Sequence, residues 1–327
     1  MRSFLIAAAS MAIGFEAHAQ DKPVLTVYTY DSFVSDWGPG PAVEAAYEAV
    51  CNCDLQLLAT GDGAAIISRL KLEGARSKAD VVLGLDTNLT AKAVEDGLVV
   101  PHGVKAAFDL PIAWEDTYFL PFDWGYFAFV YDNTKVTDVP VSLSALAASD
   151  LSVVIQDPRS STPGLGLLLW VDTALGDGAG AFWEAMADQI VTVTKGWDEA
   201  YGMFLEGEAD MVLSYTTSPA YHIVAEGDLS KSAAVFEDGH YMQVEVAGIT
   251  ATSQQPDLAR NFLEFMVSDA FQSIIPTTNW MYPVVAPADP LPEAFARPAA
   301  KALLLAPEKA AVRRDAALAT WLDALSK

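Results

Sequence analysis

A strand followed by a loop and a helix recurs along this chain, and this alternation limits the possible folds more than any other feature of the sequence. It appears at residues 23–30 and 42–50 and again at 54–60 and 64–74, and a third buried strand follows at 79–86. Because the strands are largely apolar, helices must cover both faces of their sheet. The sequence therefore predicts an α/β fold with mainly parallel strands.

Two long extended runs, at residues 118–132 and 240–253, divide the chain. Pro121 and Gly125 interrupt the first run, so we expect an extended hinge crossing between two lobes rather than one regular strand. We expect the second run to cross back. A mature chain of roughly 300 residues also exceeds what one hydrophobic core usually serves. We therefore predict two lobes, with residues 24–29 and 211–214 in separate sheets.

These crossings set the predicted division of the chain. Residues 20–120 form the first part of lobe 1, 121–243 form lobe 2, 244–290 complete lobe 1, and 291–327 form a C-terminal helical segment. Residues 1–19 are a signal peptide, in which Arg2 precedes an apolar run and Ala17 and Ala19 end it. We expect cleavage after Ala19 and export of a soluble protein, because no later run reaches ~18 consecutive apolar residues.

The charge of the chain is strongly negative, with 43 Asp and Glu residues against 19 Lys and Arg residues and a net charge of −24. This charge repels nucleic acid and anionic lipid, and it favours a cationic ligand. The cysteines, Cys51 and Cys53, leave two interpretations open, a local disulfide or a metal-binding C-x-C pair. We favour the disulfide and predict no metal site, because the histidines of the mature chain are scattered.

Hydroxyl and aromatic side chains gather where predicted strands end. The stretch "SYTTSPAY", residues 214–221, follows an apolar strand, and Pro219 indicates that a helix begins near Ser218. Open α/β sheets bind ligands beyond the carboxyl ends of their strands, and helix N-termini attract anions. Residues 160–162, Ser-Ser-Thr before Pro163, repeat this arrangement and exceed what helix capping needs. Both stretches therefore predict walls of a ligand site.

Further residues are candidates for the same site. Asp62 lies in "GDG" before a helix, where the residues alone favour plain N-capping over ligand contact. Trp197 lies beside Gly196 at another strand end, and Trp280 lies in a Pro-bounded loop, where core packing explains an aromatic ring less easily. The end of the first strand adds three more candidates: Tyr28, Tyr30 and Asp31.

Long blocks of the chain resemble a known family. "KPVLTVYTYDSF", "PFDWGYFAFVYD", "QDPRSSTPGLGLLLW", "LSYTTSPAYH" and "NWMYPV" are similar, in order and spacing, to the periplasmic thiamine-binding proteins of bacterial ABC importers. The resemblance covers nearly the whole mature chain. It implies a two-lobed extracellular solute-binding protein of the type II periplasmic fold, without catalysis. Such a protein captures thiamine, thiamine monophosphate or thiamine diphosphate between its lobes and delivers them to a membrane permease. We expect a periplasmic monomer without a cofactor.

The resemblance also implies a set of ligand contacts. These are Asp62, Gly63, Ser161, Thr162, Trp197, Tyr215, Thr216, Thr217 and Ser218. We extend the site to Tyr221 and Trp280, because a cationic thiazolium favours aromatic faces, and to Tyr30, because it lies at the end of the first strand. Ser161 and Thr162 are predicted to hold the phosphate arm, which needs hydroxyl and backbone N–H donors. No catalytic residue is predicted.

Two other functions remain open at this point. A ferric ion-binding periplasmic protein would use tyrosine oxygens with a carboxylate or His, but the chain has no adjacent pair of tyrosines. An exported phosphate-ester hydrolase would need catalytic groups near the hydroxyl cluster. Only His222 is close to that cluster, and no G-x-S-x-G or H-E-x-x-H motif occurs.

Overall fold

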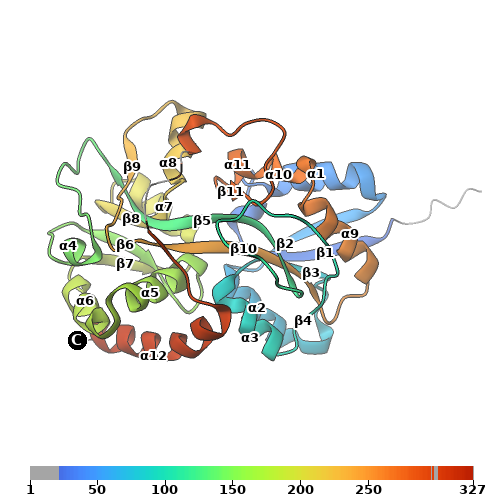
Figure 1. The fold of residues 1–327 in the computed structure, drawn as a ribbon, viewed down its shortest axis with the longest axis horizontal. Helices are drawn as coiled ribbons and strands as arrows, with labels where there is room; N and C mark the ends of the chain where they lie inside the picture. The colour runs from blue at the N-terminus through green and yellow to red at the C-terminus, as the bar shows by residue number, and fades with distance from the viewer. Residues whose placement is uncertain (1–21, 296, 298–300, 327) are drawn as a thin grey trace, which may run out of the picture.

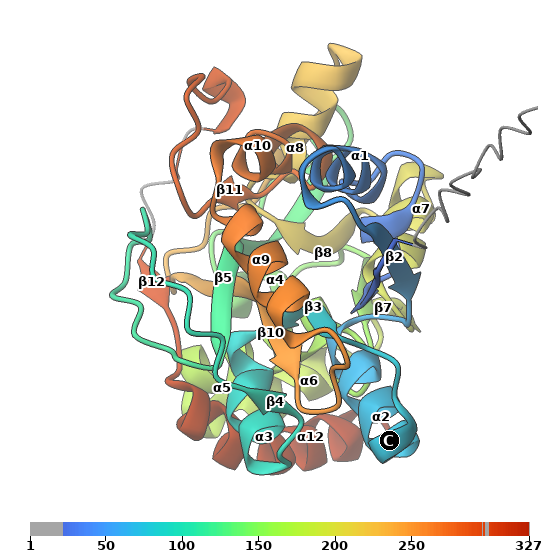
Figure 2. The same ribbon diagram turned by 90° about the vertical axis from the view of Figure 1, so that its right-hand side faces the viewer.

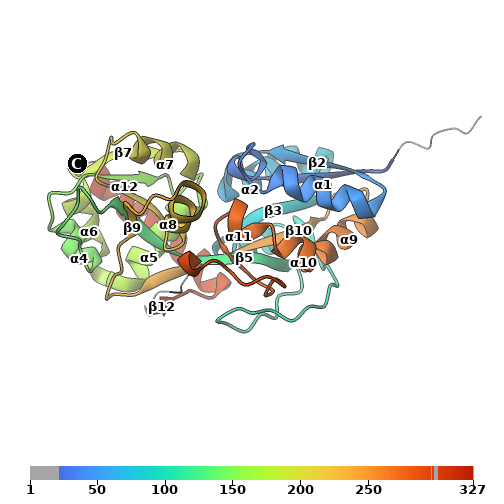
Figure 3. The same cartoon turned by 90° about the horizontal axis from the view of Figure 1, so that it is seen from above.

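The computed structural model of the protein describes residues 22–295, 297 and 301–326. The predicted signal peptide, residues 1–19, lies outside these residues. Within the described part of the chain, no helix has the length and apolarity that crossing a membrane requires. The described residues form two α/β lobes that lie side by side and are joined by long strands (Figure 1, Figure 3).

Three parallel strands form the centre of the first lobe: β1 (Val24–Thr29), β2 (Asp54–Ala59) and β3 (Val81–Asp86). Helix α1 (Gly40–Cys51) covers one face of these strands, and helices α2 (Gly63–Glu73) and α3 (Thr87–Glu95) cover the other (Figure 2). Along β3, Val81 and Leu83 join the core beneath α1, whereas Val82 and Leu85 join the core beneath α2. Gly74 ends α2, as the sequence predicts.

The second lobe has its own parallel strands: β6 (Val153–Gln156), β7 (Ile190–Thr194) and β8 (Met211–Tyr215). Helix α7 (Trp197–Leu205) packs on one face, against Val154 and Val212. Helices α4 (Leu143–Ala147), α5 (Thr162–Leu175) and α6 (Ala179–Met186) contribute to the core on the other face. Helix α8 (Ser218–Tyr221) begins at the predicted residue and continues into a π-helical turn, His222–Glu226.

Two long antiparallel strands join the lobes: β5 (Phe119–Asp132) and β10 (His240–Thr250). The first half of β5 pairs with β10, and its second half pairs with β8 of the second lobe. Hydrogen-bonded pairing therefore runs without a break through β2-β1-β3-β10-β5-β8-β6-β7. Our prediction of separate sheets for residues 24–29 and 211–214 was wrong, because the two lobes share β5 (Figure 3).

Strand β5 also differs from the irregular crossing that we expected, because it is one strand of 14 residues. Pro121 lies within it without ending it. The register with β10 shifts between Glu245 and Val246, opposite Asp123 and Pro121, and a bulge of this kind accommodates a residue without a backbone N–H. The predicted lobe boundaries after residues 120 and 243 fall inside β5 and β10, and they stay predictions.

The C-terminal part of the chain contacts both lobes. Helix α12 (Pro307–Leu325) packs against α3 of the first lobe and against α5 and α6 of the second (Figure 1). Helix α9 (Pro256–Met266) packs beside α1. Shorter elements include β4 (Val99–Val100), β9 (Lys231–Ala233), α10 (Asp269–Gln272), α11 (Ile275–Thr278), β11 (Tyr282–Pro283) and β12 (Ala302–Leu303). Cys51 and Cys53 form a disulfide at the end of α1, which confirms the favoured interpretation.

Candidate functional site

A cleft of about 460 Å³ lies between the lobes and takes its lining from both of them and from β10. This volume is typical of small-molecule sites. Most of the predicted site residues line it: Tyr30, Asp62, Thr162, Trp197, Tyr215, Ser218, Tyr221 and Trp280. Four predicted residues are not part of the lining: Gly63, Ser161, Thr216 and Thr217. The structure thus brings together residues that lie far apart in the sequence.

The N-termini of α2 and α5 meet across the cleft. The backbone N–H of Gly63 donates to Thr162 Oγ1 at 3.2 Å, and Ser161 Oγ donates to Asp62 Oδ2 at 2.8 Å. A Cβ atom on Gly63 would lie 2.6 Å from Thr162 Oγ1, so the close approach of the two helices requires glycine. Gly63 and Ser161 therefore act between the lobes, beside the cleft rather than in its lining.

Asp62 precedes α2, but its side chain makes no capping hydrogen bond to that helix. It reaches across the cleft instead, where it also accepts a hydrogen bond from the backbone N–H of Trp197 at 3.4 Å. Burial raises the pKa of Asp62 to about 6, although the hydrogen bonds from Ser161 and Trp197 act in the opposite direction. The capping interpretation of Asp62 was wrong in its geometry, because the side chain bonds to the opposite lobe.

The hydroxyl groups of Ser214 and Ser218 bond to each other. Ser218 Oγ lies 2.7 Å from Ser214 Oγ and accepts a hydrogen bond from the backbone N–H of Tyr215 at 3.2 Å. Trp197 Nε1 donates to Ser214 Oγ at 2.8 Å, which fixes the indole at the cleft wall. Thr217 is buried and its hydroxyl faces the sulfur of Met281 at 3.9 Å. Ser218 thus lines the cleft, whereas Thr217 lies behind it.

Aromatic rings form much of the cleft wall. Trp280 stacks on Phe295 with ring centroids 6.3 Å apart, and it meets Tyr221 edge to face at 5.3 Å. Its backbone has φ of 57°, a left-handed conformation that is uncommon for a bulky residue. Strained backbone conformations of this kind cluster at functional sites, where the surrounding structure holds them in place. Trp280 therefore supports the predicted ring contact.

Trp37 belongs to the cleft lining and was not predicted. Its side chain is 52% exposed and its ring lies 6.2 Å from that of Trp197. The sequence did contain a signal that Trp37 belongs to the site, because this residue lies in the Gly- and Pro-rich loop "DWGPGP" after the first strand. An aromatic ring in such a loop has little core to pack against, as we argued for Trp280.

A buried polar network beneath the cleft was also missed. Glu245 lines the cleft and accepts hydrogen bonds from Tyr30 Oη at 2.9 Å and from Gln243 Nε2 at 2.7 Å. Asn279 Nδ2 donates to Asp123 Oδ2 at 2.6 Å. The signal in the sequence was a charged residue inside each of the two extended runs, in "PFDWG" and "VEV". Both runs were interpreted only as crossings.

The charge of the lining suits a cation. Asp62, Asp198 and Glu245 contribute carboxyl groups, and none of the described residues that line the cleft is Lys, Arg or His. Burial and the neighbouring Asp123 raise the pKa of Glu245 well above its usual range. Tyr215 donates to Gln243 Oε1 at 2.9 Å and extends the same network to the second lobe.

The remaining candidates lie outside the lining. Tyr28 Oη donates to Glu73 at 3.0 Å and its ring lies under the Arg69 guanidinium, so this buried residue of β1 packs beneath α2. Asp31 accepts a hydrogen bond from the backbone N–H of Gly61 at 3.0 Å and shapes the loop before α2. The backbone N–H of Thr216 donates to the carbonyl of Tyr126 at 2.9 Å, so this residue belongs to the junction with β5.

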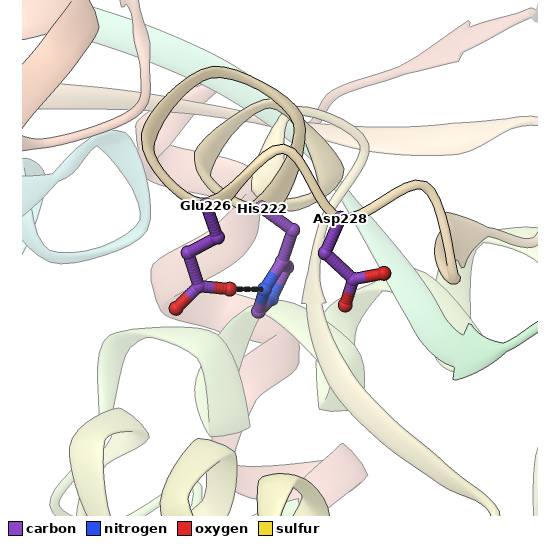
Figure 4. A group of neighbouring side chains, drawn as sticks. All are labelled: His222, Glu226 and Asp228. Carbon is purple, nitrogen blue, oxygen red and sulfur yellow. Dashed lines mark hydrogen bonds and ion pairs between the residues drawn. The ribbon is translucent and has the colours of Figure 1, made fainter.

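His222, Glu226 and Asp228 form a small group of potential metal ligands beyond α8 (Figure 4). Both ring nitrogens of His222 already have partners, because Nε2 lies 2.9 Å from Tyr201 Oη and Nδ1 lies 2.7 Å from Glu226 Oε2. A metal ion at either nitrogen would have to break one of these hydrogen bonds. We therefore interpret the group as part of the packing that supports the cleft wall.

Comparisons with known proteins agree with the resemblance seen in the sequence. Residues 76–299 match the family model of the bacterial extracellular solute-binding proteins. The chain is 55% identical to the thiamine-binding periplasmic protein of Salmonella typhimurium over 315 residues, which cover 95% of this chain and 96% of the relative. A solved periplasmic thiamin binding protein has 54% identity and a TM-score of 0.91, and the match covers 94% of this chain and 97% of that chain. Iron-bound HitA from Pseudomonas aeruginosa shares the fold alone, with 21% identity and a TM-score of 0.73 over 92% of this chain and 99% of that chain.

Proposed function

The chain belongs to the bacterial extracellular solute-binding protein family, and from this premise we propose that it captures thiamine in the periplasm for an ABC importer. Relatives at this level of identity are named as binding proteins, so the protein is a solute-binding protein and not an enzyme. The observation that carries the thiamine proposal is the cleft itself. It combines aromatic rings with carboxyl groups, and its described lining includes no basic side chain.

The chemistry of thiamine supports this assignment. The thiazolium ring carries a permanent positive charge, and a cation that leaves water needs compensation from its site. Aromatic faces supply part of it, at ~0.5 to 2 kcal/mol for each contact. Trp197, Tyr221 and Trp280 offer such faces in the cleft, and Glu245 offers a carboxyl group. The aminopyrimidine is flat and neutral, so it can stack between the same rings.

We propose that the phosphate arm of thiamine monophosphate or diphosphate lies at the N-terminus of α5. Ser161 and Thr162 stand there, and an N-terminus of a long helix attracts anions. The Asp62 carboxyl group lies 2.8 Å from Ser161 Oγ, so an ionised Asp62 would repel a phosphate. The raised pKa of Asp62, about 6, eases its protonation when a phosphate arrives. Free thiamine meets no such repulsion.

Export and delivery complete the proposal. We propose that residues 1–19 direct export and are removed after Ala19, and that the mature protein is a monomer that passes its ligand to a membrane permease. The periplasmic relatives support the location. We place the lobe boundaries within β5 and β10, the two strands that enter both lobes.

Isothermal titration calorimetry with thiamine, thiamine monophosphate and thiamine diphosphate tests the function. We expect saturable binding of thiamine by the mature chain and a rise in its melting temperature, because a ligand at ~100 times its dissociation constant stabilises the folded state by about 2.7 kcal/mol. Titration with ferric ion is the comparison for the iron alternative. A folded protein that shows neither heat nor a melting shift with thiamine would contradict the proposal.

A further inference from the structure

Three carboxyl groups lie side by side across the strands beneath the cleft. Glu245 of β10 pairs in register with Asp86 of β3 on one side and with Asp123 of β5 on the other. Asp86 and Asp123 have no exposed surface, and Glu245 is only 6% exposed. Residues directly opposite each other on adjacent antiparallel strands point to the same face. The fold thus gathers three buried acids into one row.

None of the ion pairs formed among the described residues involves these three acids. The carboxyl groups of Asp123 and Glu245 hydrogen-bond to each other. Their other side-chain partners are neutral: Asn88 for Asp86, Tyr30 and Gln243 for Glu245, and Asn279 for Asp123. The titratable groups that face Glu245 are Asp86, Asp123 and Tyr30, with Tyr215 beyond Gln243. Adjacent buried carboxylates without a cation cannot all ionise, so the row retains protons near neutral pH.

Glu245 is the member of this row that reaches the cleft lining. Asp86 is tied to the N-terminus of α3 by its hydrogen bonds to Asn88, and burial raises its pKa to about 7. Asp123 lies behind Glu245 and is held by Asn279, which also lines the cleft. Burial raises the pKa of Asp123, and burial together with Asp123 raises that of Glu245. Two neighbouring acids of this kind titrate as a pair.

We propose that Glu245, with Asp123 behind it, is the counter-ion for the cationic ring of the ligand, and that the pair gives up a shared proton to water when the ring binds. This inference rests on the proposed function. A positive ring above the pair supplies the charge that the row lacks, and it favours the ionised form of the acids. Thermodynamic linkage then requires that the affinity for the cation increases with pH while the empty pair is still protonated.

Calorimetry of the mature chain with thiamine, in two buffers that differ in ionisation enthalpy, counts the protons released. The titration is run near pH 7.5, above the pKa of about 6 at Asp62, so that Asp62 contributes little to the count. We expect release of up to about one proton for each thiamine bound. We also expect the dissociation constant to fall as the pH rises from about 6 to about 8.

The variant Glu245→Gln keeps the size of the side chain and one of the two oxygen atoms that accept hydrogen bonds from Tyr30 and Gln243. We expect it to bind thiamine at least about tenfold more weakly near pH 8, with no proton released and little dependence on pH. Glu199→Gln is the matched control, because Glu199 is an exposed glutamate of α7 outside the cleft lining. Its affinity should stay within about twofold of the parent, and circular dichroism checks that both variants fold.

Two ring probes separate the charge from the rest of the ligand: neutral 4-methyl-5-(2-hydroxyethyl)thiazole and its N-methylated cation. The parent should prefer the cation, and Glu245→Gln should lose that preference. If this variant does not fold, two measurements on the parent still test the inference: the number of protons released when thiamine binds, and the preference for the cationic probe over the neutral one. Binding of thiamine by the parent without proton release and with affinity independent of pH would overturn the inference alone. A folded parent that binds no thiamine would overturn the proposed function, and the ring probes would then test the counter-ion by themselves.

Discussion

Trp280 combines an aromatic face in the cleft with a backbone φ of 57°, so its substitution tests contact and strain together. We expect Trp280→Ala to weaken free thiamine by more than tenfold, about 1.4 kcal/mol, because a cation–π face is lost. Trp280→Gly should weaken binding equally while it tolerates the left-handed backbone better. Calorimetry and melting curves of the two variants separate the loss of the ring from the change in backbone strain, and Glu308→Gln, at an exposed position of α12, is the control. An unchanged affinity in both variants would remove Trp280 from the site.

The row of acids makes a second prediction at the residue scale, about stability without ligand. Their folded pKa values are raised, so the stability they contribute is complete below about pH 4 and is lost as the pH rises through the folded pKa values, about 7 for Asp86. The contribution of the row to the melting temperature of the empty protein should therefore decrease across this window. Asp123→Asn keeps an acceptor for Asn279 and should raise the stability near pH 8 by about 1–3 kcal/mol, with little effect near pH 4. Parallel pH curves for parent and variant would contradict this account.

Helix N-termini carry the prediction at the scale of elements. If the N-terminus of α5 holds the phosphate arm, Thr162→Ala should weaken thiamine monophosphate more than thiamine, by ~1 to 3 kcal/mol. Thr162→Ser should bind the two ligands with the same relative affinities as the parent, because serine retains the hydroxyl that accepts a hydrogen bond from the backbone N–H of Gly63. Asp62→Asn should shift the preference towards the monophosphate, since it removes a nearby negative charge. Calorimetry with both ligands measures these ratios, and equal losses for the two ligands in Thr162→Ala would place the phosphate elsewhere.

Elements were predicted well where the signal was local. Gly74 ended α2 and Pro219 marked the start of α8, because caps and prolines act within one turn. Strand β5 was mispredicted, because the bulge that accommodates Pro121 depends on the partner strand β10. Pairing between distant strands also shapes the site, so local signals in the sequence could not predict all of it. The row of Asp86, Glu245 and Asp123 exists only through strand register, and no short stretch of sequence contains it.

At the scale of the whole molecule, the lobes are linked by β5 and β10 and are bridged again by α12. In the arrangement described here, hydrogen bonds join α2 of the first lobe to α5 of the second, from Ser161 to Asp62 and from Gly63 to Thr162. A ligand between two such lobes binds by closing them as rigid bodies. The interlobe hydrogen bonds therefore favour the closed arrangement even without ligand.

Removal of one of these hydrogen bonds should shift the empty protein towards an open arrangement. We expect Ser161→Ala to have a larger radius of gyration than the parent in the absence of thiamine, and saturating thiamine to bring both to the same smaller value. Small-angle X-ray scattering measures the change. Ser68→Ala is the matched control, because Ser68 bonds only within α2, to the carbonyl of Ala64. If calorimetry shows that thiamine binds and the radius of gyration of Ser161→Ala stays the same with and without it, then the lobes do not close on the ligand. The interlobe hydrogen bonds would in that case only fix the position of Asp62.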